Sequence, residues 1–355
     1  MSFGEEVKIS LFGESHSYCV GMLVEWLKSG IYLDINYLEE KLKKRKTHDK
    51  LSTSRNEEDK IEFLSGVFNN FTDGSPLVFI IKNKDIKSED YIKGNIRPSH
   101  ADYTYYEKYH HYNDYRGGGY SSGRLTAPII VLGAIIESIL PNIKVTSRIY
   151  QIGDVFDDEE VDINSLDGLF ATSNKEKSIL MQKEIEKAKL DNDSLGGIVE
   201  TFVQGVPIGL GEPFFDSLES MISHALFSIG GVKGVLFGDG IKFASSRGSE
   251  VNDQMSYIDG KVTYLTNHNG GINGGISNGQ VISFKTIIKP TSSISKTMKT
   301  INVQDQSNIE LNLKGRHDSC LVHRIKPVID ALTYYVIYEM MLRGKKWNTD
   351  WLEKF

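Results

Sequence analysis

Apolar and polar residues alternate along several segments of the chain in the manner of β-strands. In residues 7–13 the apolar side chains fall on one face, and the run ends in a glycine turn that leads directly to Ser15 and His16. Related strand-like patterns occur at residues 61–68, 197–206 and 280–290. The chain is therefore predicted to form sheets, with a serine and a histidine delivered at the end of its first strand.

Other segments show the spacing of apolar residues that is typical of α-helices. The clearest helix pattern begins at Asp216, which makes a capping-box-like start with Glu219, and its apolar stripe leaves His224 exposed. Residues 127–140 are almost wholly apolar but shorter than the roughly 20 residues of a membrane span, so we expect a buried core helix there and no membrane partner. Further helices are predicted at residues 21–30, 38–50 and 327–343.

The order of these elements bears on the fold class. The strand patterns at residues 197–206 and 280–290 alternate as antiparallel strands do, and no repeated strand, loop and helix unit of a parallel sheet is present. No linker, internal repeat or low-complexity tract divides the chain, although the polar residues 157–193 could form a helical insertion. We therefore expect one large α+β domain over residues 1–355.

Composition narrows the class of protein. The formal net charge of -6 argues against a nucleic-acid partner, because binding to a phosphate backbone needs a concentrated basic surface. Cys19 and Cys320 are the only cysteines and lie far apart, which predicts no disulfide framework. The first residues lack the basic start and apolar core of a signal peptide. A cytoplasmic protein is the expectation.

Glycines gather in three loops, at residues 116–123, 228–234 and 270–279. Such loops either form tight turns or wrap a phosphate or a flat ring closely with their bare backbone. Neither the dinucleotide fingerprint G-x-G-x-x-G nor a Walker-type P-loop is complete anywhere in the chain. The run KPTSSIS, residues 289–295, offers a cation and several hydroxyls after a strand, which suits a phosphate monoester or a polar strand terminus.

Three histidines, His16, His100 and His317, lie in runs of polar residues, a poor setting for a core histidine and a reasonable one for general acid work. No ligand spacing such as H-x-x-x-H supports the alternative of a metal site, so we expect no metal. His110 and His111 are adjacent and would point to opposite faces of a strand.

Eight ordered motifs resemble the chorismate synthase family over essentially the whole chain: GESHS, RPSHADYTY, RGGGYSSGR, GVPIGLGEPFFDSL, VKGVLFGDG, GGINGGISNG, KPTSSIS and GRHDSC. The resemblance implies a lyase that forms chorismate and phosphate from 5-enolpyruvylshikimate 3-phosphate by an anti 1,4-elimination, in the last step of the shikimate pathway to aromatic amino acids. It implies reduced FMN (FMNH2) without net redox change, NADPH as a possible source of reductant, a β-α-β sandwich with antiparallel sheets, and a homotetramer.

The resemblance also implies roles for individual residues. His16 matches the general acid at the leaving phosphate, His100 the histidine near the flavin pyrimidine edge, and Asp318 the group that helps flavin N5 take the C6 proton, with Ser15 and Ser122 as a hydroxyl relay. The flavin site maps to Ser121, Ser122, Gly230, Gly231, Gly274, Lys289, Pro290, Thr291, Ser292, Ser293 and Arg316. The substrate cations map to Lys44, Arg45, Lys50, Arg124 and Arg316.

The chain departs from the family pattern at several positions. Ser17 replaces a glycine, Tyr120 replaces an arginine, and Lys44 and Lys50 stand where arginines are expected, which gives up bidentate geometry. Two other functions stay open: an FMN-dependent oxidoreductase that reduces its own flavin with NADPH, and a non-catalytic flavin- or phosphate-binding protein. We expect activity to be retained, because the acid, proton-handling and phosphate groups are all present.

Overall fold

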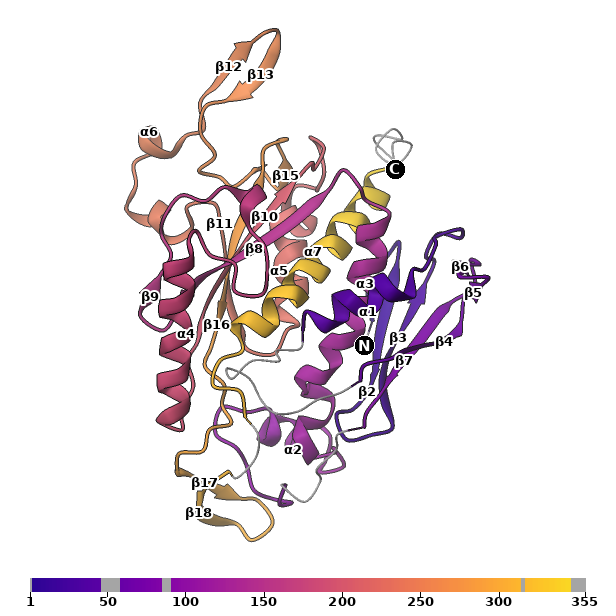
Figure 1. Cartoon of the computed structure of the whole chain (residues 1–355), viewed down its shortest axis with the longest axis vertical. Helices are drawn as coiled ribbons and strands as arrows, with labels where there is room; N and C mark the ends of the chain where they lie inside the picture. Colours follow the sequence, from indigo (N-terminus) through magenta and orange to yellow (C-terminus); the bar gives the residue numbers. More distant parts are fainter. Residues whose placement is uncertain (1, 46–57, 85–90, 314–316, 346–355) are drawn as a thin grey trace.

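Two five-stranded antiparallel sheets face each other across a layer of helices in the computed structural model, which describes residues 2–45, 58–84, 91–313 and 317–345 (Figure 1). The first sheet has the order β1 (Ser2–Phe3), β2 (Lys8–Gly13), β3 (Cys19–Glu25), β7 (Leu77–Lys82), β4 (Ile61–Ser65). The second has the order β11 (Val232–Phe237), β16 (Ile282–Ile288), β10 (Gly197–Gln204), β8 (Lys144–Ile152), β9 (Val155–Phe156). The predicted α+β sandwich with antiparallel sheets is confirmed.

The helical layer is built on two long helices, α3 (Thr126–Ser138) and α7 (Val322–Gly344), which pack against each other. A Cβ added at Gly133 would lie only 2.5 Å from the Cα of Ala331, so the two helices cross at close range. Helix α1 (Ile35–Lys43) contacts α3, and α5 (Leu218–Phe227) contacts α7 and β11. The core of the protein therefore lies between the sheets.

Helix α3 is apolar all round because it has protein on every side. Every residue from Ala127 to Ile136 is buried, between α7 and the first sheet. The segment Arg116–Ser138 is long and apolar enough to cross a membrane, yet 72% of its apolar window is buried inside the protein. The predicted core helix is confirmed.

The remaining elements lie outside this sandwich or join its layers. Two hairpins project from opposite ends of the molecule, β12 (Met255–Ile258) with β13 (Lys261–Tyr264), and β17 (Met298–Asn302) with β18 (Ser307–Leu311) (Figure 1). Helix α4 (Lys175–Leu190) packs on β8 and β9, so the polar residues 157–193 do contain a helix. The shorter pieces are β5 (Val67–Phe68), β6 (Phe71–Thr72), α2 (Asp102–Lys108), η2 (Arg116–Ser121), η3 (Gly123–Leu125), η4 (Ile163–Ser165), η5 (Phe214–Asp216), η6 (Gly240–Ser245), α6 (Gly248–Val251), β14 (Ile272–Asn273) and β15 (Ile276–Ser277).

Two predictions of secondary structure are wrong. Residues 21–30, expected as a helix, contain most of strand β3, which is paired on both sides by β2 and β7. Val20, Met22 and Val24 are fully buried, but the residue between the last two, Leu23, is also apolar, and a short apolar run of this kind cannot be told from a helix by its pattern. His110 and His111 lie in a turn after α2 with φ of +51° and +71°, not in a strand.

Two helix starts differ from prediction. Helix α5 is capped by Ser217, whose side chain accepts the N–H of Ser220 at 3.1 Å, rather than by Asp216. Helix α7 begins at Val322 and therefore contains Pro327, which has no N–H and removes one backbone hydrogen bond from the helix. His224 is exposed, as predicted.

Glu339, which is 0% exposed, fastens the N-terminal segment to α7. Its Oε1 accepts the N–H groups of Glu5 at 2.7 Å and Glu6 at 3.0 Å, and its Oε2 accepts that of Val7 at 2.8 Å. Arg343 donates to Oε1 at 2.9 Å from one turn further along the helix. One buried carboxylate therefore satisfies three backbone donors immediately before β2.

Replacing Glu339 should destabilise the fold strongly. We expect Glu339→Ala to lower the free energy of unfolding by roughly 3–5 kcal/mol, because it leaves Arg343 and three backbone donors without their acceptor. Glu339→Gln, which keeps one oxygen, should cost less. Urea unfolding followed by circular dichroism measures both, with the exposed Glu186→Gln on α4 as the matched control. A loss for Glu339→Ala no larger than that of the control would contradict this role.

Candidate active site

Strand β2 ends in a turn that presents Ser15 and His16. The turn begins at Gly13, whose φ is +91°, and the hydroxyl of Ser17 closes it by accepting the N–H of Glu14 at 3.0 Å. Ser15 is 0% exposed, and its Oγ lies 2.8 Å from Nδ1 of His16. The serine that departs from the family pattern at position 17 thus stabilises the turn locally.

Three consecutive glycines, Gly117 to Gly119, form the surface against which two of the predicted site residues pack. Their φ angles are +59°, +92° and +51°, all in the left-handed region that glycine adopts without strain. A Cβ on Gly117 would overlap the ring of His16, and a Cβ on Gly118 would lie 3.2 Å from Cε1 of His100. Bare backbone therefore brings His16 and His100 against neighbouring residues of one turn.

His100 is held by a carboxylate and an arginine that the sequence analysis missed. Its Nδ1 lies 2.7 Å from Oδ1 of Asp102, and Arg97 donates to both carboxylate oxygens at 2.7 Å. Burial alone would raise the pKa of Asp102, but the hydrogen bonds from Arg97 and His100 outweigh burial and hold this pKa well below its ordinary range. An acid two residues after the histidine, in the same motif, was the available signal.

Loops from distant parts of the chain meet beside His100. Ser121 donates to Gly118 O at 2.7 Å, and a Cβ on Gly230 would find Ser121 O at 3.9 Å. The N–H of Lys289 donates to Gly231 O at 2.9 Å, and its Nζ donates to Ser99 O at 2.6 Å. The structure thus joins the loop at 228–234, the run at 289–295 and the His100 segment.

The described part of this region has features that suit a flavin phosphate and ring. A Cβ on Gly231 would meet no described heavy atom closer than 3.9 Å, so this glycine exposes bare backbone. Oγ1 of Thr291 is buried without a hydrogen-bond partner among the described residues. Burial lowers the pKa of Lys289, and the charge of Lys233 lowers it further, a repulsion that a bound anion would offset. These residues fit the reduced flavin that the resemblance implies.

The structure does not bring every predicted flavin residue close to the others. Gly274 lies in the turn between β14 and β15, where the nearest neighbours of the adjacent Gly275 are Glu212 and Ser217. Ser293 accepts a 3.4 Å hydrogen bond from Nη1 of Arg97. Two further residues of the predicted flavin run 289–293 are Pro290, whose ring lies against Gly196, and Ser292. Arg316 lies outside the described residues.

Asp318 lies just before α7 and forms an ion pair with Arg324. Ser15 hydrogen-bonds to His16 and to Arg116 O, and Ser122 Oγ accepts the N–H of Arg124 at 3.3 Å. No hydrogen bond joins Asp318, Ser15 and Ser122 to one another, although all three are described. The structure therefore does not present the expected hydroxyl relay as a continuous chain.

The predicted substrate cations have different environments. Arg124 is buried and paired with Asp59, and it also donates to Asn83 Oδ1 at 2.9 Å. Arg45 is buried and donates to Gly123 O at 2.8 Å. Lys44 is exposed at the end of α1. Lys50 lies outside the described residues.

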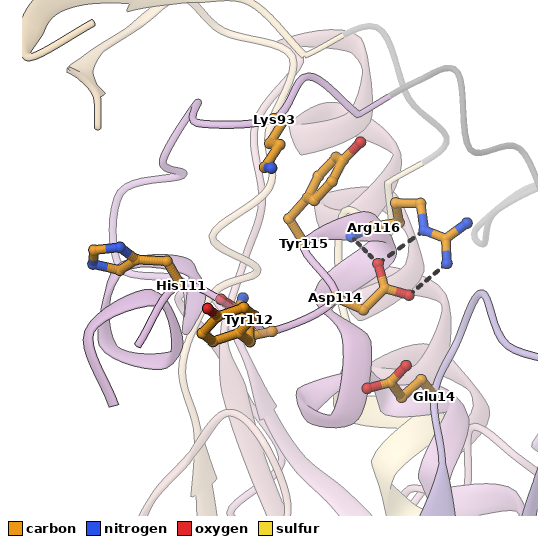
Figure 2. A pocket seen from close by; sticks show the side chains of 8 residues that line it. Glu14, Lys93, His111, Tyr112, Asp114, Tyr115 and Arg116 are labelled. Carbon is orange, nitrogen blue, oxygen red and sulfur yellow. Dashed lines mark hydrogen bonds and ion pairs between the residues drawn. The ribbon is translucent and has the colours of Figure 1, made fainter. Parts of the chain in front are cut away.

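A pocket of about 540 Å³ opens next to the glycine turn (Figure 2). Asp114 and Arg116 form two parallel hydrogen bonds of 2.8 Å there, which neutralise the arginine charge. Burial raises the pKa of Glu14, Asp114 raises it further, and Arg116 opposes both. The lining residues are Glu14, Lys93, His111, Tyr112, Asn113, Asp114, Tyr115 and Arg116. Because Glu14 precedes Ser15 and Arg116 precedes Gly117, the pocket lies next to the histidine at the end of β2.

Tyr120, where the family pattern has an arginine, points back to the first sheet. Its hydroxyl donates to Leu11 O in β2 at 3.0 Å, and its ring packs against the hydrophobic core. Burial, and secondarily Tyr109, raises the pKa of this phenol, so it stays a neutral donor. Tyr120 supplies no cation; it ties the glycine turn to the strand that carries Ser15 and His16.

Comparison with known proteins identifies the family. The family model described as chorismate synthase matches residues 7–342. Chorismate synthases of Korarchaeum cryptofilum and Porphyromonas gingivalis are 40% and 39% identical to this chain; each match covers 97% of it, and 98% and 96% of the relative. The solved structure titled "Crystal Structure of Chorismate Synthase" superposes with a TM-score of 0.77 at 24% identity, covering 99% of each chain, and so shares the fold. Over nearly its whole length, therefore, this chain belongs to the chorismate synthase family.

Proposed function

We propose that this protein converts 5-enolpyruvylshikimate 3-phosphate to chorismate and phosphate by an anti 1,4-elimination that requires reduced FMN. The observation that carries the proposal is the packing of His16 and His100 against consecutive glycines in a chain of this family. An elimination that releases a phosphate and a proton needs groups that can transfer protons. The two histidines are such groups, and both lie against one turn.

His16 is assigned as the general acid. Phosphate leaves more readily when it is protonated, and a histidine can supply that proton near neutral pH. Ser15 Oγ bonds Nδ1 of His16, so Nε2 is the ring nitrogen assigned to the leaving phosphate. The ring of Tyr91 meets the ring of His16 at 81°, with centroids 5.2 Å apart, and this contact helps to orient the imidazole.

The flavin side of the reaction is assigned to the loops beside His100. Reduced FMN, when bound, supplies electron density to the substrate and takes it back, so the reaction has no net redox change. Ser121, Ser122, Gly230, Gly231 and Gly274, together with Lys289, Pro290, Thr291, Ser292, Ser293 and Arg316, would hold it. The open glycine surface and the buried hydroxyl of Thr291 support this assignment.

Asp318 is assigned to the transfer of the C6 proton, with Ser15 and Ser122. Because these three groups are not hydrogen-bonded to one another, the transfer would need bound ligands or water to bridge them. The bond from Leu195 N to Ser319 O and the bond from Ser194 Oγ to Thr291 O tether the Asp318 segment to the proposed flavin run. This tether supports a place for Asp318 near the cofactor.

Binding of the phosphate and carboxylate groups of the substrate is assigned to five cationic residues: Lys44, Arg45, Lys50, Arg124 and Arg316. Arginine forks suit carboxylate and phosphate groups, and the acidic net charge makes such local cations necessary. Arg124 is buried and already paired with Asp59, so an anion would bind beside this ion pair, whereas Lys44 is exposed to solvent.

The assembly is assigned as a cytoplasmic homotetramer of one-domain chains spanning 1–355, with NADPH as a possible source of reductant. Phe214 and Phe215 are 87% and 93% exposed in the single chain, and apolar side chains this exposed are suited to burial between subunits. Sedimentation equilibrium measures the state of assembly directly.

The reaction itself is tested by an anaerobic assay with photoreduced FMN and 5-enolpyruvylshikimate 3-phosphate. Chorismate and phosphate should appear in equal amounts, and His16→Ala should lower kcat by about 100-fold or more while FMN still binds. Stoichiometric NADPH consumption without added reductant would favour the oxidoreductase. Binding of both ligands without either product would leave only a binding protein.

Gly117 should be intolerant of a side chain. Alanine at a φ of +59° costs about 1–2 kcal/mol, and its Cβ would displace His16. We expect Gly117→Ala to lower kcat/KM at least about 10-fold, because a displaced acid meets the leaving group poorly. Gly248→Ala, at a glycine with open space around it, is the control. Steady-state kinetics and thermal melting are the measurements; equal activity of the two variants would refute the proposed packing constraint.

A further inference from the structure

We propose that Asp102, clamped by Arg97, is a positioning residue for His100: it fixes the proton on Nδ1 and turns the Nε2 edge of the ring toward the glycine turn. The inference rests on the proposed function for its effect on turnover, but the geometry that carries it is independent of that function. It adds two residues, neither of which touches the reacting atoms, to the machinery of the site.

The carboxylate of Asp102 has no acceptor position to spare. Oδ1 accepts from His100 Nδ1 and from Arg97 Nη2, both at 2.7 Å. Oδ2 accepts from Arg97 Nε at 2.7 Å and from the backbone N–H of Arg97 at 3.0 Å. Four donors on two oxygens hold the group in one orientation and in its ionised form.

An ionised carboxylate only accepts hydrogen bonds, which decides the histidine tautomer. Nδ1 of His100 must carry the hydrogen that Asp102 receives, so Nε2 of the neutral ring holds the lone pair. The other side of the ring meets the glycine turn: a Cβ on Gly118 would lie 3.2 Å from Cε1 and 3.4 Å from Nε2. The nitrogen that can exchange a proton is thus the one on the ring edge facing Gly118.

Arg97 connects this clamp to both sides of the candidate site. Only 6% exposed, it lies over the ring of Tyr91 at 5.6 Å, and Tyr91 also packs edge-on against His16. Its remaining nitrogen, Nη1, reaches Ser293 Oγ in the proposed flavin run at 3.4 Å. A shift of Arg97 would therefore disturb His100 and its neighbours together.

A purely local role in helix α2 does not explain these contacts. Asp102 is the first residue of α2, yet the helix has no side-chain cap, and the carboxylate bonds run back to Arg97 and His100. An acid in the first turn would gain from the helix dipole wherever it pointed. The direction of its side chain is therefore explained by the histidine and the arginine.

The test compares Asp102→Asn with the double variant Arg97→Gln/Asp102→Asn. The single variant leaves Arg97 buried without its counter-charge and could unfold, whereas the double variant replaces the ion pair with neutral amides that can bond to each other. The matched control is Asp259→Asn, an exposed position in the turn of the β12–β13 hairpin, where Asn-Gly is as suitable as Asp-Gly.

Two readouts separate positioning from structure. Long-range nitrogen-15 NMR of the histidines at about pH 8.5, where an ordinary imidazole is neutral, should show His100 as the Nδ1–H form in the wild type and as a mixture in both variants. The His100 signal is assigned as the one missing from His100→Gln. In the elimination assay, kcat of the folded double variant should fall about 10–100-fold, with KM changing less than about threefold.

A folded double variant with wild-type kcat would overturn the proposal, as would an unchanged His100 tautomer, because the clamp would then be structural only. A wild-type protein that performs no elimination would overturn the proposed function alone. The tautomer of His100 and its loss in the variants are read without turnover, so they would still support the positioning role in that case.

Discussion

The left-handed backbone of Gly117 to Gly119 is the constraint on which the candidate site depends. A Cβ at Gly117 would overlap the ring of His16, a Cβ at Gly119 would overlap the backbone oxygen of Asp114, and a Cβ at Gly118 would crowd the edge of His100. Three successive positive φ angles are tolerated because glycine lacks a Cβ. The hydroxyl of Tyr120 donates a hydrogen bond to β2, so this glycine turn and the strand hold each other in place.

Ion pairs determine which cationic side chains are available to bind an anion. Several of the guanidinium groups that could bind an anion are already paired with carboxylates: Arg97 with Asp102, Arg116 with Asp114, Arg124 with Asp59, Arg148 with Glu200, and Arg324 with Asp318. A paired arginine orients loops and histidines more than it attracts a distant anion. At the candidate site, the paired Arg97, Arg116 and Arg124 therefore serve mainly to hold the loops in place.

The sandwich gathers the loops because its two sheets and central helices place their ends together. Ser121 precedes α3, Gly231 precedes β11, Lys289 follows β16 and Asp318 precedes α7, so each comes from a different element of the rigid core. Backbone bonds such as Lys289 N to Gly231 O then join these loops directly. Glycine-rich loops that are held by rigid strands and helices are suited to binding a flat ring closely.

The sequence by itself determined the sheets, the core helix α3, the main amphipathic helices and the family, because local periodicity and ordered motifs reflect backbone geometry and chemistry directly. It singled out His16 and His100 but missed Asp102 and Arg97, whose importance lies in contacts. Strand β3 was misjudged because the apolar Leu23 on its less buried face interrupts the alternation of apolar and polar residues in the sequence. Only the tertiary structure decided that two histidines meet one glycine turn and that arginines are paired, since both depend on packing between residues far apart in the chain.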